Sequence, residues 1–274
     1  MAPNADQSST SQPGHPPQGA PVLELIAASI ASPHFAHWAV LEHVNLSVLE
    51  GEFWVVGGLP GSGKSQLLET LAGLLPPLGG TVRLFGRDAA DMGSDLLSEI
   101  RPKIALVYGD GGRLFPELNV AQNVALPLRY HRNSAIEGVT REVSDILTGL
   151  GLHEFSASTP NRLNRTWRQR VAFARALALQ PEVVLLDNPL AGVDPRQTRW
   201  WLEFLRRLPT GEIPVAPRTR TVVIATDNLR PWLAAGRRFG LLREGAFLSF
   251  GPGEDLSASK EPLLRELLAD STPT

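Results

Sequence analysis

The residues whose types and spacing most clearly specify chemistry run from Gly58 to Ser65 and read G-L-P-G-S-G-K-S. They match the pattern G-x-x-x-x-G-K-[ST], in which glycines allow successive backbone N–H groups to curl around a phosphate. The lysine of such a loop reaches the outer phosphates of a nucleotide, and the hydroxyl that follows it holds Mg²⁺. The pattern therefore predicts a nucleoside triphosphate site. Its predicted binding residues are Gly58, Gly61, Ser62, Gly63, Lys64, Ser65 and Gln66, with Ser65 also on the metal.

A phosphate loop of this kind needs a strand before it and a helix after it. Residues 53–56 are continuously apolar, and residues 67–75 carry apolar side chains at helical spacing. The helix would point its positive end at the bound phosphate. The flanking sequence thus supplies the context that the motif requires.

Composition limits the classes of protein to which the chain can belong. It has 274 residues, is 43% hydrophobic and carries a net charge of −2. This allows one large or two small α/β domains, and it gives no overall attraction to nucleic acid. The absence of cysteine excludes disulfides and thiol chemistry, and no apolar run reaches the roughly 18 residues of a membrane span. The first twenty residues are rich in Pro, Gln and Ser, which predicts a disordered tail over residues 1–20.

The order of the predicted elements indicates an α/β fold with a mostly parallel sheet covered on both faces, because strand-like runs alternate with helical patterns. Three prolines predict a surface loop over residues 209–220. The strand-like runs are 22–27, 44–49, 53–56, 81–85, 104–108, 183–186, 221–225, 239–242 and 246–250. The helical patterns are 67–75, 120–128, 139–150, 168–179, 196–208 and 262–268.

Over about residues 22–268 this order of parts resembles the ATP-binding subunit of ABC transporters. L-L-D at Leu185–Asp187 is similar to the family's Walker B strand, and V-D-P at Val193–Pro195 is similar to its D-loop. Q-R-V-A-F-A-R-A-L at Gln169–Leu177 looks like the helix after the family's signature, and L-F-P-E-L at Leu114–Leu118 looks like the stretch after its Q-loop. A second likeness, to the Mla-type lipid-trafficking branch, depends on N-V-A-Q-N-V-A-L-P-L-R at 119–129 and on the pattern at 259–268.

The resemblance implies a P-loop nucleotide hydrolase fold with an antiparallel strand subdomain and a helical subdomain at about 110–165, all within an ATP-binding domain spanning 21–274. It implies ATP and Mg²⁺ as cofactors, with Asp187 as a metal ligand and Phe35, or alternatively Trp38, stacked on adenine. The implied partners are a transmembrane permease and a second ATP-binding subunit, identical or different. The implied location is cytoplasmic, on the inner face of the membrane, and no nucleic acid is expected.

The chain departs from this family at the residues that carry hydrolysis. Asn188 stands where the family has a glutamate that polarises the attacking water, and an amide cannot accept a proton at neutral pH. Asp227 stands where the family has its switch histidine, and its charge would repel a γ-phosphate. No histidine occurs after His153, so no downstream residue can replace it.

Two further segments depart from the family pattern. Gly109 occupies the Q-loop glutamine position, and the adjoining Asp110 is either a metal ligand or part of a flexible turn. The signature L-S-G-G-Q becomes L-N-R-T-W at 163–167, so side chains stand where the partner's phosphate should approach. Arg165 could instead place a charge on phosphate, and Trp167 could stack. The arginines around it, Arg162, Arg168, Arg170 and Arg175, are expected on a solvated face.

These substitutions leave the residues for binding and alter those for catalysis. We therefore expect an ATP-binding subunit of an ABC-type transporter that binds MgATP and hydrolyses it slowly or not at all. The alternative is an active ATPase subunit that energises transport, with lipid among the possible cargoes. A soluble family member without a membrane partner is disfavoured, because the chain lacks long coiled-coil insertions and a fused second domain.

Overall fold

The computed structural model describes residues 19, 21–33, 35, 37–109, 113–132, 136–251, 256 and 259–269. Nearly all of the predicted disordered tail, and Asp110 with it, lies outside these residues.

A six-stranded sheet forms the centre of the fold, with the strand order β10-β9-β3-β8-β7-β6. The β3, β8, β9, β7 and β6 strands run parallel to their neighbours, and β10 pairs antiparallel with β9. Successive residues of β7 face opposite sides, so Val184 and Leu186 join one core cluster and Val183 and Leu185 join the other. The six strands are β3 (Phe53–Gly58), β6 (Ile104–Val107), β7 (Val183–Asp187), β8 (Thr221–Thr226), β9 (Arg238–Arg243) and β10 (Ala246–Phe250).

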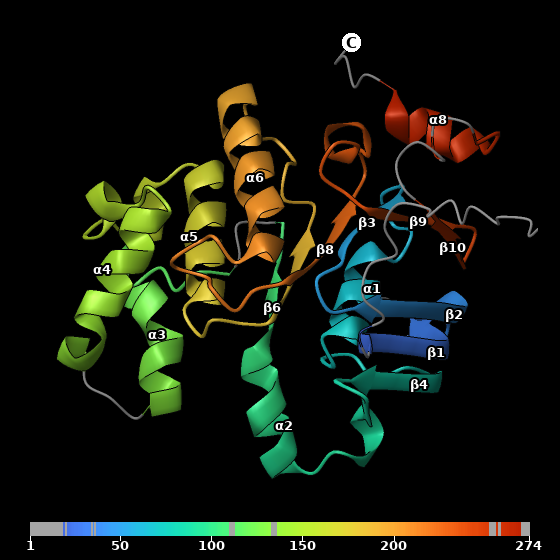
Figure 1. The fold of residues 1–274 in the computed structure, drawn as a ribbon, viewed down its shortest axis with the longest axis horizontal. Helices are drawn as coiled ribbons and strands as arrows, with labels where there is room; N and C mark the ends of the chain where they lie inside the picture. The colour runs from blue at the N-terminus through green and yellow to red at the C-terminus, as the bar shows by residue number, and fades with distance from the viewer. Residues whose placement is uncertain are drawn as a thin grey trace, which may run out of the picture.

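A second, antiparallel sheet of four strands has the order β2-β1-β4-β5. Its strands are β1 (Pro21–Ala31), β2 (Ala39–Leu49), β4 (Gly79–Leu84) and β5 (Arg87–Asp88). Helix α1 (Lys64–Leu71) lies between the two sheets, and its Leu67, Leu68 and Leu71 are fully buried in the core that they share (Figure 1). This contact fixes the start of α1 against the end of β3.

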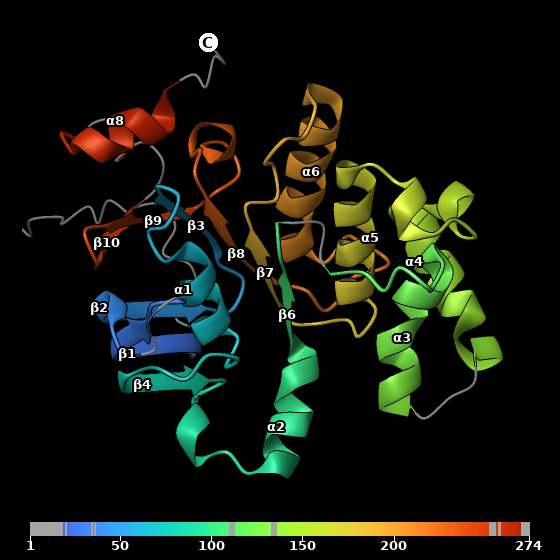
Figure 2. The ribbon, with the colours of Figure 1, turned by 180° about the vertical axis from the view of Figure 1, so that it is seen from behind.

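The remaining helices cover the other face of the parallel sheet or lie at its ends (Figures 1 and 2). Helices α3 and α4 stand at the end of the molecule farthest from the antiparallel sheet, and α8 lies beside β9 and β10. The helices are α2 (Ser94–Ile100), α3 (Val120–Arg132), α4 (Thr140–Gly149), α5 (Arg165–Leu177), α6 (Pro195–Arg207) and α8 (Pro262–Leu268). Short 3₁₀ helices occur at Ala89–Asp91, Arg101–Lys103, Ile136–Val139, His153–Phe155, Pro160–Arg162, Leu208–Thr210 and Arg230–Trp232.

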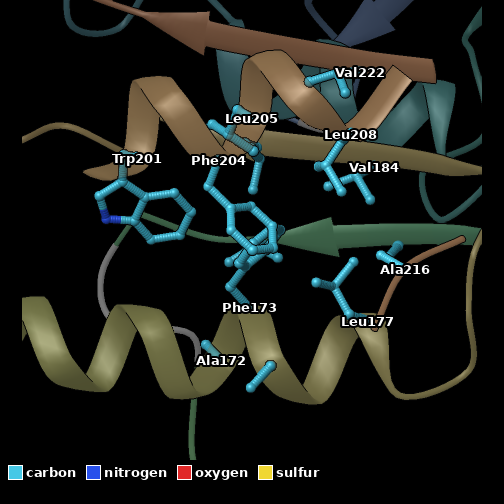
Figure 3. Close-up of a cluster of buried hydrophobic side chains, with 14 of the residues drawn as sticks. Ala172, Phe173, Leu177, Val184, Trp201, Phe204, Leu205, Leu208, Ala216 and Val222 are labelled. Carbon is cyan, nitrogen blue, oxygen red and sulfur yellow. The ribbon is translucent and has the colours of Figure 1, made fainter. Parts of the chain in front are cut away.

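Aromatic side chains join α5 to α6 over the sheet (Figure 3). Phe173 points from α5 toward α6, where its ring centroid lies 4.9 Å from that of Trp201 and 5.6 Å from that of Phe204. Trp201 and Phe173 are fully buried. Truncating such a side chain to alanine typically costs about 3–5 kcal/mol of stability, so this cluster is a strong contact between α5 and α6.

The α/β fold class, with its mostly parallel sheet, antiparallel strand subdomain and helical segment, is confirmed. Helix α2 and strand β5 were not expected, since they are only seven and two residues long. The segment 209–220 follows the surface as predicted only in part, because Ile213 and Ala216 are buried in the core beside α5 and α6. The prolines of this segment follow the end of α6, and its apolar side chains then pack against the core.

Candidate nucleotide-binding site

The phosphate loop connects β3 directly to α1. Gly61 and Gly63 have φ values of 82° and 93°, which residues with a Cβ rarely adopt. A Cβ on Gly58 would lie 2.4 Å from Ser62 Oγ, so only glycine allows the loop to close this tightly. Ser62 Oγ is buried without a hydrogen-bond partner among the described residues. The loop is therefore a backbone cradle with an unsatisfied hydroxyl, which fits a bound phosphate group.

Lys64 begins α1 and turns back over the loop. Its Nζ donates hydrogen bonds to Gly58 O at 2.6 Å and Leu59 O at 2.7 Å, and the residue is 8% exposed. Burial lowers the pKa of Lys64 below its usual 10.5, and the negative charges of Asp227 and Asp187 partly oppose this. The ammonium is thus placed at the loop with carboxylates nearby and little water around it.

Ser65 and Asp187 meet at the end of the sheet although they are 122 residues apart, with Ser65 Oγ donating to Asp187 Oδ2 at 2.6 Å. Asp187 ends β7, one strand away from β8 and two from β3, which delivers the phosphate loop. A hydroxyl and a carboxylate are oxygen ligands of the kind that Mg²⁺ prefers. The structure thus brings together the two residues predicted to hold the metal.

Asn188 and Asp227 face each other just beyond the ends of β7 and β8. Asn188 Nδ2 donates to Asp227 Oδ2 at 3.0 Å, and Asn188 N donates to Ala225 O at 2.7 Å. Asn188 has a φ of 45°, a left-handed value that asparagine tolerates better than most residues. The two positions that differ most from the family in chemistry are therefore direct neighbours.

The loop and these strand ends line an open cavity of about 480 Å³. The lining residues predicted from the sequence are Gly61, Gly63, Lys64, Ser65, Gln66, Asp187, Asn188 and Asp227. Gly58 and Ser62 belong to the phosphate loop but are not part of the cavity lining. The lining also contains Pro33, Pro60, Tyr108, Gly109, Arg165 and Ala191.

Phe35 lies outside the lining of this cavity, in the turn between β1 and β2. It is 65% exposed, and its ring centroid lies 5.9 Å from that of Trp38, which is 73% exposed. Hydrogen bonds from Trp38 N to Phe35 O and from Ser32 N to Trp38 O hold the turn. Stacking on adenine by one of these two exposed rings stays a prediction.

Sequence reasoning did not identify Tyr108 as part of the site. Its hydroxyl donates to Glu69 Oε1 at 2.9 Å. Burial, reinforced by the hydrogen bond to Glu69, raises the pKa of Tyr108 to about 12, so the phenol stays neutral. The available signal was its position at the end of a buried strand, beside Asp187 on the neighbouring strand.

The segment in place of the family signature starts α5, and Asn164 caps that helix by accepting from Trp167 N at 3.0 Å. The Trp167 ring packs on Phe155, with centroids 4.7 Å apart. The expectation of a solvated arginine face is wrong for Arg170, which is 4% exposed and lies over the Trp200 ring at 3.5 Å. Its planar cation packs between aromatic rings, a role that charge alone does not predict.

The phosphate loop between a parallel strand and a helix, with an aspartate ending a neighbouring strand, defines a P-loop nucleotide-binding protein. The family model for ABC transporters matches residues 41–191. The chain therefore belongs to the ABC transporter family, as an ATP-binding subunit.

Curated relatives and solved structures agree with this assignment. The chain is 30% identical to the probable ribonucleotide transport ATP-binding protein mkl of Mycobacterium tuberculosis, over 94% of this chain and 70% of that protein. It is 35% identical to the probable sulfate/thiosulfate import ATP-binding protein CysA of Chlorella vulgaris, over 82% of this chain and 90% of that protein.

The dimeric ATP-binding cassette MJ0796, solved in a post-hydrolysis state with ADP and Pi, has a TM-score of 0.73 and 29% identity to this chain. The match covers 84% of this chain and 98% of that one. ATP-binding subunits of this family dimerise and work with transmembrane permease components. In the described part of this chain, no helix is long and apolar enough to cross a membrane.

Proposed function

We propose that this chain is an ATP-binding subunit that docks on the cytoplasmic face of a membrane permease, pairs with a second ATP-binding subunit, and binds MgATP with slow or absent hydrolysis. Occupancy of the site, rather than rapid turnover, would then shift the conformation of the assembly. The observation that carries this proposal is the amide of Asn188 hydrogen-bonded to Asp227, beside a phosphate loop whose glycines, lysine and hydroxyl are all present.

The binding part of the proposal is supported by the loop geometry. In it, backbone N–H groups of residues 58–65 hold the phosphates, Lys64 pairs with the outer ones, and Ser65 and Asp187 hold Mg²⁺. One hydroxyl and one carboxylate suit Mg²⁺, which keeps its other positions for water and phosphate oxygens. Among the described residues no group of three or more His, Asp or Glu could form a protein cage for a metal. The remaining metal ligands would come from the nucleotide and water.

The slow-hydrolysis part depends on the groups that face the outer phosphate. Loss of a general base typically lowers a rate by about 10²–10⁴-fold. Asn188 cannot take a proton from water, and Asp227 adds a negative charge near the place where charge develops in the transition state. In this family each site combines the phosphate loop of one subunit with the signature of the other. Either a homodimer or a mixed dimer would therefore carry damage in both sites.

The test is steady-state phosphate release by the purified chain with MgATP, measured beside binding of a fluorescent ATP analogue. Lys64→Ala is the control for both measurements. We expect analogue binding that weakens by about 100-fold or more in Lys64→Ala, because a charged hydrogen-bonding group is lost, with phosphate release no higher in the wild type than in the variant. Lys64-dependent phosphate release at the rate of an ordinary transporter ATPase would contradict the slow-hydrolysis part.

One observation favours the second candidate, an active ATPase subunit that energises transport. The Asp227 carboxylate lines the same cavity as Lys64 and accepts a hydrogen bond from Asn188, so a proton acceptor lies beside the residue that stands in place of the family's glutamate. In this alternative Asp227 orients or deprotonates the water. Lys64-dependent phosphate release that is lost in Asp227→Asn would identify it.

Lipid cargo, the finer form of this alternative, draws on the residues at 119–129. In the structure their asparagines have local roles: Asn119 caps the start of α3, and Asn123 Nδ2 donates to Phe115 O, Leu118 O and Asn119 O at 3.0 Å each. These asparagines therefore explain how α3 begins, and they give no information about the transported substrate. The names of the two curated relatives concern transport of ribonucleotides and import of sulfate or thiosulfate.

A further inference from the structure

Arg165 lines the cavity of its own chain, together with the phosphate loop. It stands at the first turn of α5, and its Nη2 donates to Gly109 O at 2.8 Å, although the two residues are 56 positions apart. A Cβ on Gly192 would lie 3.8 Å from Arg165 Nη1, so the side chain also runs along the loop that follows β7. Two loops, one after β6 and one after β7, thus lie close to a single guanidinium.

The position of Arg165 depends on residues without side chains. Gly109 offers Arg165 its backbone carbonyl, and a Cβ there would meet Asp187 O at 2.6 Å. The residue is exposed and makes no ion pair with any described residue. One contact to a carbonyl leaves most of the guanidinium N–H donors available, and guanidinium is suited to bind phosphate through two parallel hydrogen bonds.

The charges in the cavity lining support a phosphate group as the ligand of Arg165. The charged side chains in its lining are the cations Lys64 and Arg165 and the anions Asp187 and Asp227. Without Arg165 the lining would be net negative, which opposes entry of a triphosphate. Lys64 and Asp187 mark the end of the cavity where the outer phosphates and their metal would bind, and the loop that Arg165 contacts through Gly109 lies against Asp187.

We propose that Arg165 binds the terminal phosphate of the nucleotide held by its own phosphate loop, and so makes a single chain prefer a triphosphate over a diphosphate. This rests on the proposed function, because it assumes that the cavity binds nucleotide. In this proposal the start of α5 contacts the nucleotide that is bound by the same chain. A contact across the dimer would instead reach the nucleotide that is bound by the partner subunit.

The experiment compares Mg²⁺ complexes of a fluorescent non-hydrolysable ATP analogue and of fluorescent ADP, titrated into dilute protein whose monomeric state is verified by sedimentation. The variants are Arg165→Ala, which removes the side chain, and Arg165→Gln, which keeps a polar side chain with an N–H donor but carries no charge. Arg162→Ala removes an exposed arginine three residues earlier and is the matched control. Thermal unfolding without nucleotide verifies that each variant folds as the wild type does.

We expect both Arg165 variants to weaken triphosphate binding by about tenfold and diphosphate binding by less than about twofold, while Arg162→Ala changes neither. An equal loss for both nucleotides would overturn the inference, since it would mean a purely structural role. An effect seen only where the protein dimerises would also overturn it, because the contact would then be made across the dimer. Wild-type protein that binds neither nucleotide would overturn the proposed function and this inference with it, whereas wild-type binding with an unchanged triphosphate preference in Arg165→Ala overturns this inference alone.

Discussion

The two ends of the nucleotide cavity are built in different ways. At the phosphate loop the important features are backbone features: left-handed glycines at 61 and 63, and a glycine at 58 that leaves room for Ser62. In the part of the lining beyond the ends of β6, β7 and β8, the features are side chains, namely Asn188, Asp227 and Arg165. The phosphate loop keeps the glycines, lysine and hydroxyl of its motif, while at the strand ends an amide stands at 188 and a carboxylate at 227.

This difference teaches that the position of a catalytic residue and its chemistry are set separately. Parallel pairing of β7 with β8 places Asp187 beside Ala225, and the Asn188 N–H then donates to Ala225 O. Side chains at positions 188 and 227 would therefore meet just beyond the last paired residues of these two strands. The sheet can therefore hold both positions in place after the residues there have changed, and binding can persist where hydrolysis is slow.

The largest effect is expected when the side chains at 188 and 227 are changed to those that the family has at these positions. The double variant Asn188→Glu with Asp227→His should raise phosphate release from MgATP by about 10- to 100-fold over the wild type, because it returns a proton acceptor and removes a repelling charge. Asn188→Glu alone should gain less, since the new carboxylate would lie beside that of Asp227.

Adding Lys64→Ala to the double variant is the control, and it should abolish the gain. Phosphate release that stays at the wild-type level in the double variant would contradict the view that these two side chains limit turnover.

A smaller effect is expected when the charge at 227 is removed alone. Asp227→Asn keeps the shape and can still accept from Asn188 Nδ2, but it removes a negative charge beside the outer phosphate. Affinity for the ATP analogue should rise by about three- to tenfold, with a smaller change for ADP. Equilibrium titration at low salt measures this, and an affinity that falls would mean that Asp227 contributes to binding, through the metal or otherwise.

The smallest effect concerns pH at the binding end. Burial lowers the pKa of Lys64 in the free protein below 10.5, and a bound triphosphate favours the ammonium and raises that pKa again. Binding therefore takes up a proton between the two values, so affinity should fall by a few-fold as pH rises through this interval, starting below 10.5.

Titrations of the ATP analogue at increasing alkaline pH test this, with Lys64→Arg as the control, since a guanidinium stays charged throughout. Tyr108, with its pKa of about 12, does not titrate in this window. A wild-type affinity that holds constant up to pH 10.5 would show that Lys64 stays fully protonated.

Several structural features follow from the sequence because they depend on neighbours along the chain. The phosphate loop is determined within eight residues, and continuous apolar runs predict β3, β7 and β8 as strands buried on both faces. Helix α2 was missed because it is only seven residues long, too short for the spacing of Leu96, Leu97 and Ile100 to establish a helical period. Arg170 was placed wrongly because the residue types on its own helix do not reveal that Trp200 of α6 covers it.

The sequence by itself predicted a phosphate site at residues 58–65 and the alternation of strands with helices, and it places an amide side chain at 188. Only the tertiary structure decided which distant residues meet: Asn188 with Asp227, 39 positions apart, and Arg165 with its own Gly109, 56 positions apart. The physical reason is that such meetings depend on strand order and helix packing, which arise from the burial of the whole core and not from any local pattern.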